Sequence, residues 1–438
     1  MYQSPKSFTM HMRKSTISRV KIRVRVGSTM EKVERKTMPY WKQIILILTA
    51  GWVAIWIYRV VLTPIYPIIS QYFNGATDAQ LGSISSFYFL GYAAMQIPSG
   101  MLVDRFGKRK IIIPGFLLFA MGALLVGVSA SLVTVYIGSI FAGLGCGTYY
   151  GVAYSLTATE VPANKKSLAT AIVNSGTAVG SGIGLISSSF LVGNGYLPWQ
   201  ALIFATVVII LVMVGVFFKF IRPEAPQQTT KVVKEKTTSG NLLKNLFQPQ
   251  MIVAYLLYFS TLYTYYLIDT WLPNFLETER HVQGTLIGVI SSLVFFAAIP
   301  GALIFSRLAD AMPQKKVQLI VLLELLAAGV LFMTVTVENH ALLVTGIIAY
   351  GFFGKLAVEP IIISWLSQFA PRSAVATTYG VFNFFGMIAS IIAPSLTGFI
   401  SDHTGSKVLG FYLAIAIIVL GTSIFYLVNR KVTKQISH

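Results

Sequence analysis

The chain has 438 residues, of which 55% are hydrophobic and 11% are charged, and its formal net charge is +19 at pH 7. A soluble protein of this length cannot hide so much apolar surface, so the composition excludes a soluble globular fold and makes lipid the solvent for most of the chain. The single cysteine, Cys146, excludes an internal disulfide and a cysteine-based metal cluster.

Positive residues are distributed unevenly between the expected loops. Lys and Arg fall almost wholly in alternate loops, and only Arg280 and Lys407 lie in the opposite set. This is the positive-inside pattern of proteins in the cytoplasmic membrane, and it predicts that both termini are cytoplasmic. The charge therefore indicates topology, and we expect no nucleic-acid partner.

The chain is expected to begin with a basic cytoplasmic arm, residues 1–42, in which Met30 is an alternative start that would leave out residues 1–29. Twelve apolar stretches that are long enough to cross a membrane follow. They form an N-terminal six-helix bundle (43–221) and a C-terminal one (251–428), joined by a cytoplasmic linker (222–250) and followed by a cytoplasmic tail (429–438). The predicted spans are 43–70, 79–103, 111–130, 132–159, 168–192, 198–221, 251–276, 284–306, 317–337, 341–369, 374–400 and 407–428. The fold class is therefore an all-α membrane protein.

The two bundles repeat each other in sequence. A shift of 206 residues aligns Pro67 with Pro273 and the segment GSISSFYF (82–89) with GVISSLVF (288–295). Repeated halves are typical of secondary transporters, which move two similar bundles around a site near the middle of the bilayer.

Arg59 lies inside the first apolar span, in the stretch AIWIYRVVLTPIYP. A charged side chain near the bilayer centre costs roughly 2.5–3.5 kcal/mol, so such residues are functional by default. Arg59 follows Lys42 by seventeen residues, about 25 Å along a helix, which places it beyond the membrane centre unless the helix tilts or breaks at Pro64 and Pro67. We expect Arg59 to contact a substrate, and the alternative is a side chain that extends to the outer interface.

The loop SGMLVDRFGKRK (99–110) resembles the cytoplasmic signature loop of the major facilitator superfamily, and SRLADAMPQKK (306–316) is its second-half copy. Together with twelve spans and the repeat, the resemblance covers nearly the whole chain beyond the arm. It implies two pseudo-symmetric six-helix bundles, and Gly100 would allow two helices to approach closely. The loop residues that it marks for the conformational change are Gly100, Asp104, Arg105, Gly107, Arg109 and Asp310.

Three further segments look like the anion:cation symporters and the sugar-phosphate permeases of that superfamily. They are YYLIDTWLPNFL (265–276), AAIPGALIFSRLAD (297–310) and NFFGMIASIIAPSLTGFISDHTGS (383–406). The resemblance implies that Arg59 holds an anionic substrate, with Tyr92, Gln96 and Asn383 as further contacts.

The chain departs from the pattern of those branches at three places. Tyr58 stands where symporters carry an acid before the arginine, Cys146 stands where they often carry another, and Thr264 and Tyr265 stand where sugar-phosphate antiporters carry a second arginine. One fixed arginine suits a monoanionic carboxylate better than a phosphate dianion.

Three charged positions in the second half are candidates for coupling or binding. Asp269 lies beside several tyrosines, and because burial disfavours a charged carboxylate it is a proton-coupling candidate. The alternatives for Asp269 are an ion pair with Arg59 or exposure in an outer vestibule. Lys355 and Glu359 lie four residues apart on one helix face, so Lys355 is a candidate anion contact and Glu359 a second proton-coupling candidate. Their alternative is a self-neutralised pair that only stabilises the bundle.

Other polar residues in the spans carry weaker predictions. Tyr150 and Tyr265 are candidate substrate contacts, although tyrosines in such helices more often serve packing. Glu324, in a helix that is usually peripheral in this family, is expected to be structural or to extend to the membrane surface.

We therefore expect a monomeric secondary transporter in the cytoplasmic membrane that moves a small organic anion, a carboxylate or a sugar acid, by alternating access with protons as the coupling ion. No nucleotide-binding loop, metal-ligand motif or hydrolase motif is present, so we expect no enzyme activity, cofactor or metal. Efflux or exchange of other molecules, such as a sugar phosphate or a drug, is an alternative, although NSGTAVGSGIGLI (174–186) lacks the proline of the efflux motif. A non-transporting nutrient sensor is a further alternative.

Overall fold

The computed structural model describes residues 20–26, 29–35, 38–162, 165–223, 246–369 and 375–436. Most of the predicted linker (222–250) and residues 1–19 of the predicted arm lie outside the described residues, as does the side chain of Asp104.

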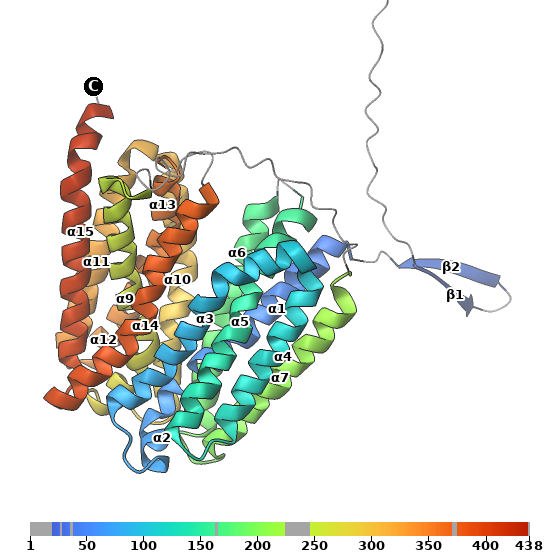
Figure 1. The fold of residues 1–438 in the computed structure, drawn as a ribbon, viewed down its shortest axis with the longest axis horizontal. Helices are drawn as coiled ribbons and strands as arrows, with labels where there is room; N and C mark the ends of the chain where they lie inside the picture. Colours follow the sequence, from blue (N-terminus) through green and yellow to red (C-terminus); the bar gives the residue numbers. More distant parts are fainter. Residues whose placement is uncertain are drawn as a thin grey trace, which may run out of the picture.

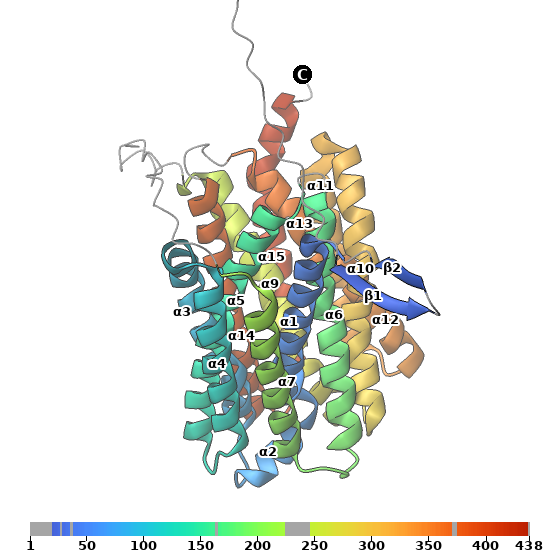
Figure 2. The same cartoon turned by 90° about the vertical axis from the view of Figure 1, so that its right-hand side faces the viewer.

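The first group of helices runs from residue 40 to residue 220. Its elements are α1 (Tyr40–Val60), the 3₁₀ turn η1 (Thr63–Ile65), α2 (Tyr66–Tyr72), α3 (Asp78–Phe106), α4 (Lys108–Gly127), α5 (Leu132–Glu160), α6 (Lys166–Leu191) and α7 (Trp199–Phe220). Figure 1 shows this group, in blue to green, beside the second group, in yellow to red. Figure 2 shows α1 packed between α6 and α7.

The second group runs from residue 249 to residue 436. Its elements are α9 (Pro249–Thr278), α10 (Thr285–Ala311), the 3₁₀ turn η3 (Pro313–Lys315), α11 (Lys316–Thr336), α12 (His340–Phe353), α13 (Lys355–Leu366), α14 (Val375–Thr404) and α15 (Val408–Ile436). The two groups meet along α3 with α14 and along α6 with α10. The end of α15 and the turn at α2 lie at opposite ends of the molecule (Figure 1).

A short hairpin precedes the helices, where the sequence predicts only a basic arm. Strands β1 (Val20–Val26) and β2 (Thr29–Arg35) pair antiparallel, with Val20 opposite Arg35. The alternation of Val and Ile with Lys and Arg in VKIRVRV has the two-residue period of a strand, which accounts for the pairing.

The described helices match the twelve predicted spans in length, and eleven of them also match in composition. Eleven helical segments of the described chain are long and apolar enough to cross a membrane, and the segments Tyr40–Tyr72 and His340–Leu366 each combine consecutive helices. The twelfth, α3, spans 29 residues but is less apolar because it carries serines, tyrosines and Gln96. The prediction of an all-α membrane protein with twelve transmembrane helices is confirmed.

Two of these spans are broken near the middle of the bundle. Helix α1 ends at Val60, one residue after Arg59, and the prolines at 64 and 67 begin the next two turns, as the sequence predicts. The tenth predicted span, 341–369, is wrong as a continuous helix because α12 ends at Phe353 and α13 begins at Lys355, with Gly354 between them. One break follows Arg59 and the other precedes Lys355, and both residues are candidate substrate contacts from the sequence.

Glycines let the backbones of neighbouring helices touch. A Cβ atom at Gly143 of α5 would lie 2.0 Å from the carbonyl oxygen of Tyr88 on α3, and one at Gly82 of α3 would lie 2.3 Å from the carbonyl oxygen of Pro394 on α14. At Gly100 a Cβ would point into open space, with no atom of the described chain within 4 Å, but α3 and α5 do approach closely here, because a Cβ at Gly151 of α5 would lie 3.4 Å from the Gly100 Cα atom. Gly82 therefore presses the two groups together at the α2 end of α3, whereas Gly143 tightens the packing inside the first group.

We predict that Gly143→Ala destabilises the protein by about 1–3 kcal/mol, because the added methyl group must displace the α3 backbone. Gly215→Ala is the matched control, since a Cβ there meets nothing within 4 Å in the described chain and a helical Ala is favoured over Gly. Thermal unfolding in detergent measures both. Equal melting temperatures for the two variants would contradict the packing.

Candidate functional site

Arg59 occupies the last turn of α1, at the break in the first span. The final carbonyl groups of a helix carry partial negative charge, which stabilises a cation at that position. The break therefore offsets part of the cost of placing a fixed charge among apolar helices.

Four aromatic rings surround the Arg59 guanidinium. Its central carbon lies 4.5 Å from the ring centroid of Trp56, 4.7 Å from Phe89, 4.9 Å from Tyr92 and 5.5 Å from Tyr88. The ring faces attract a cation through their quadrupoles without using its N–H groups. The charge is thus held by α1 and α3, while its hydrogen-bond donors stay available.

Two of the three guanidinium nitrogens of Arg59 lack protein partners in the described chain. Nε and Nη2 are buried and have no hydrogen-bond acceptor. No salt bridge among the described residues joins Arg59 to Asp269, so the ion pair weighed from the sequence is not formed in this conformation. Burial of these nitrogens also contradicts the alternative of a side chain that extends to the outer interface.

Asp269 presents a second charge from α9, in the other group of helices. Its residue is 6% exposed, which contradicts exposure in an outer vestibule, and its Oδ1 is buried with no hydrogen-bond partner. Ring contacts join the two groups around it: Trp56 meets Phe295 at 6.2 Å and Phe89 meets Tyr266 at 4.5 Å between ring centroids. Arg59 and Asp269 therefore flank one aromatic interface between the groups.

Lys355 and Glu359 form an ion pair on α13. The Nζ–Oε2 distance is 2.9 Å, and the Tyr258 hydroxyl donates a hydrogen bond to the other carboxylate oxygen. The ammonium of Lys355 also lies 5.2 Å from the ring centroid of Tyr265. The predicted pair thus exists, and a tyrosine of α9 reinforces it.

Gln96 and Asn383 meet across the two groups. The Asn383 amide donates a 2.6 Å hydrogen bond to Oε1 of Gln96, which joins α3 to α14. Tyr150 is 37% exposed on α5. Its neighbour Tyr149 is a packing residue, because its ring stacks on Trp52 at 5.2 Å and its hydroxyl donates to the Leu48 carbonyl.

The remaining predicted residues belong to the signature loop and its copy. Arg105 and Asp310 are exposed, and the Arg109 guanidinium lies 4.3 Å from the ring centroid of Phe218. Among these three side chains, the described contacts do not involve the Arg59 site.

A polar cluster that sequence reasoning missed joins the groups at the α2 end of the molecule. Asp402 of α14 accepts hydrogen bonds from the backbone N–H groups of Asp78 and Ala79, at 2.7 and 2.9 Å. The Asp78 carboxylate pairs with Lys407 at 2.7 Å and accepts a 2.6 Å hydrogen bond from Ser401. We call these residues the α3–α14 clasp. Lys407 was the available signal, because it is one of two basic residues outside the positive loops.

The aromatic set around Arg59 was also missed in part. Trp56 and Phe89 read as ordinary apolar residues in the sequence, although Trp56 precedes Arg59 by three positions and therefore shares its helix face.

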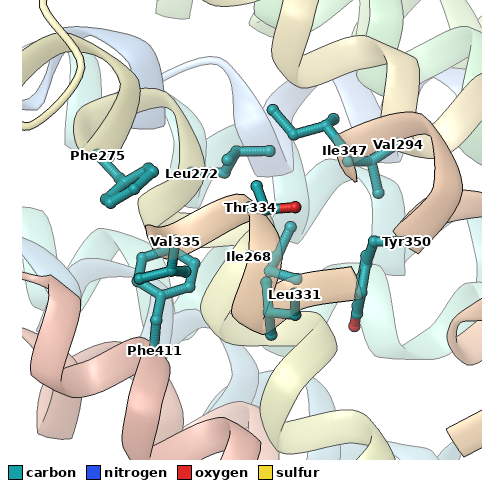
Figure 3. Close-up of a pocket in the computed structure, with 10 residues that line it drawn as sticks. All are labelled: Ile268, Leu272, Phe275, Val294, Leu331, Thr334, Val335, Ile347, Tyr350 and Phe411. Carbon is teal, nitrogen blue, oxygen red and sulfur yellow. The ribbon is translucent and has the colours of Figure 1, made fainter. Parts of the chain in front are cut away.

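A small cavity lies apart from this interface, inside the second group. It measures about 10 Å³, and Figure 3 shows the largely apolar side chains that line it: Ile268, Leu272, Phe275, Val294, Leu331, Thr334, Val335, Ile347, Tyr350 and Phe411. A space of that size holds at most one water molecule, so it is not a substrate site. Among the described residues, no cluster of three or more His, Cys, Asp or Glu side chains is placed to hold a metal.

Known transporters match this chain over most of its length. The chain is 24% identical to the hexuronate transporter of Bacillus subtilis, over 76% of this chain and 82% of that one. It is 26% identical to the 3-(3-hydroxy-phenyl)propionate transporter of Escherichia coli, over 80% and 85%. The fold matches a bacterial homologue of the human lysosomal transporter Spinster, in an inward-facing and occupied conformation, with a TM-score of 0.74 and 14% identity over 90% and 98% of the chains.

The model of the Major Facilitator Superfamily matches residues 47–394 and, in a second match, residues 254–437. The helices, their two groups and these relatives identify a transport protein rather than an enzyme. The chain belongs to the Major Facilitator Superfamily.

Proposed function

We propose that this protein moves a small organic monocarboxylate across the cell membrane by alternating access, and that Arg59 binds the carboxylate. The observation that carries the proposal is the pair of buried Arg59 nitrogens without acceptors in the described chain. Buried donors without partners are costly, and a charged donor is the costliest. A carboxylate would supply both the opposite charge and two acceptor oxygens.

The charge balance of the site favours a monoanion. Lys355, whose ammonium lies 5.2 Å from the ring centroid of Tyr265, is already neutralised by Glu359. Thr264 and Tyr265 stand where a second arginine would serve a phosphate dianion. The two relatives described above are named for carboxylates, a hexuronate and a hydroxyphenylpropionate, which supports the same class.

The substrate body would contact side chains from both groups. Tyr92 and Gln96 approach from α3, Tyr265 from α9 and Asn383 from α14, with Tyr150 and Lys355 at the margins. The bond between Gln96 and Asn383 is one that a substrate hydroxyl or carbonyl group can replace, since both amides keep further donors or acceptors.

We further propose proton coupling, with Asp269 favoured over Glu359. Glu359 is bound by Lys355 and Tyr258, so its charge is compensated. Asp269 is buried without a salt bridge in the described chain, and therefore has more to gain from a proton.

Alternating access requires one end of the interface to close while the other opens. The α3–α14 clasp holds the α2 end with charged groups, whereas toward the other end of α3 a neutral hydrogen bond joins Gln96 to Asn383. With both termini cytoplasmic, as the positive residues predict, the clasp closes the outer side and this conformation faces inward.

We predict that Arg59→Ala strongly weakens saturable carboxylate uptake into proteoliposomes. Charge-assisted hydrogen bonds contribute about 1.5–3 kcal/mol, so substrate affinity falls by roughly ten- to a hundredfold even if folding is intact. Arg430→Ala, at an exposed arginine of α15, is the matched control and keeps uptake. Wild-type uptake by a correctly folded Arg59→Ala protein would rule out the proposed role.

We predict that Lys407→Gln opens the outer side more often, because it removes the salt bridge to Asp78. A network contact of this kind contributes roughly 1–3 kcal/mol, which corresponds to a shift of about fivefold to a hundredfold in the equilibrium. The measurement is labelling of Ser86→Cys, in a Cys146→Ser background, by a membrane-impermeant thiol reagent applied from outside.

Ser86 suits this measurement because it is buried on α3 between the two groups, where its hydroxyl accepts a hydrogen bond from Ser395. Lys316→Gln is the control, since Lys316 binds Ser364 within the second group. Labelling that is no faster in Lys407→Gln than in this control would show that the clasp does not close the outer side.

A further inference from the structure

Glu324 lies inside the second group of helices, on α11, apart from the Arg59 interface. Its residue is 1% exposed, so the expectation that this side chain extends to the membrane surface is wrong. Helix α11 packs on α12, α13 and α15. The Glu324 side chain lies within hydrogen-bond distance of Thr261 on α9. The proposed transport site does not account for the burial of this carboxyl group.

The hydrogen-bond contacts of Thr261 indicate whether this carboxyl group is protonated. The Thr261 hydroxyl lies 2.9 Å from the Leu257 carbonyl oxygen and also within hydrogen-bond distance of Oε1 of Glu324. A carbonyl oxygen only accepts, and a hydroxyl has one hydrogen to donate. If Thr261 donates to Leu257, its contact with Glu324 is a hydrogen bond only when Glu324 is the donor.

The lack of a positively charged partner in the described chain also indicates that Glu324 is a neutral carboxylic acid. No Lys, Arg or His of the described chain forms a salt bridge with Glu324, and its Oε2 is buried without a hydrogen-bond partner. In the described part of the chain, a titratable group that interacts with it electrostatically is Tyr350 of α12, which carries no positive charge. An ionised carboxylate in this setting would be a buried, unpaired charge, whereas a neutral acid would leave only one weak acceptor unsatisfied.

We propose that Glu324 is a proton-binding site: it holds a proton in this conformation and donates it in a hydrogen bond to Thr261. The neutral bond continues through Thr261 to the Leu257 carbonyl and ties α11 to α9, the helix that carries Tyr265 and Asp269. This proton site is separate from the coupling candidates Asp269 and Glu359, and it does not depend on the identity of the substrate.

The test is infrared spectroscopy of the purified full-length protein in lipid, comparing wild type with Glu324→Gln. We expect the wild-type spectrum to contain a carboxylic-acid C=O stretching band that the variant loses. Subtracting the two spectra removes any band from Asp269. Glu338→Gln, at an exposed residue near the end of α11, is the matched control and leaves the band unchanged.

A Glu324→Gln spectrum that loses a carboxylate band instead would overturn the proposal, because Glu324 would then be ionised. If Glu324→Gln does not fold, Thr261→Val examines the same bond. Removing the acceptor shifts the frequency of the wild-type acid band, because the Glu324 proton loses its partner. An unshifted spectrum in Thr261→Val would equally contradict the assignment.

Discussion

The fixed positive charge of Arg59 lies between two groups of apolar helices, and the neighbouring residues must offset the cost of burying it. The end of α1 supplies partial negative charge, and the rings of Trp56, Phe89 and Tyr92 supply attraction through their faces. Neither uses the N–H groups. These interactions stabilise the charge but leave the buried donors unsatisfied, which is the basis of the proposal that an anion from outside the protein binds there.

The contacts between the two groups differ at the two ends of the interface. At the α2 end, Asp402 binds the first backbone N–H groups of α3 while Lys407 pairs with Asp78, and glycines press the backbones together. Toward the other end, Gln96 and Asn383 make a single neutral bond. Polar contacts of this kind exchange readily with water, so they suit an interface that must open and close, whereas extensive apolar packing would resist separation.

The twelve helices follow from the sequence because bilayer thickness fixes the length of each span, and Arg59 is found because a charge is conspicuous in an apolar run. Other features depend on tertiary contacts. Phe89 contacts the Arg59 guanidinium only when the fold brings α3 against α1, and the clasp joins Asp402 to a backbone 324 positions away. No proline at position 354 marks the break between α12 and α13 in the sequence. The burial of Glu324 depends on which face of α11 the other helices cover.

The central claim is that Arg59 binds the carboxylate of the substrate, and ligand-induced stabilisation of purified protein tests it most directly. A ligand present at a hundred times its dissociation constant stabilises a protein by about 2.7 kcal/mol, which is visible as a rise in melting temperature. We expect a hexuronate or a hydroxyphenylpropionate to raise the melting temperature of the wild type and not that of Arg59→Gln. Equal stabilisation of the two proteins, or stabilisation of the wild type by a sugar phosphate and by neither carboxylate, would contradict the account.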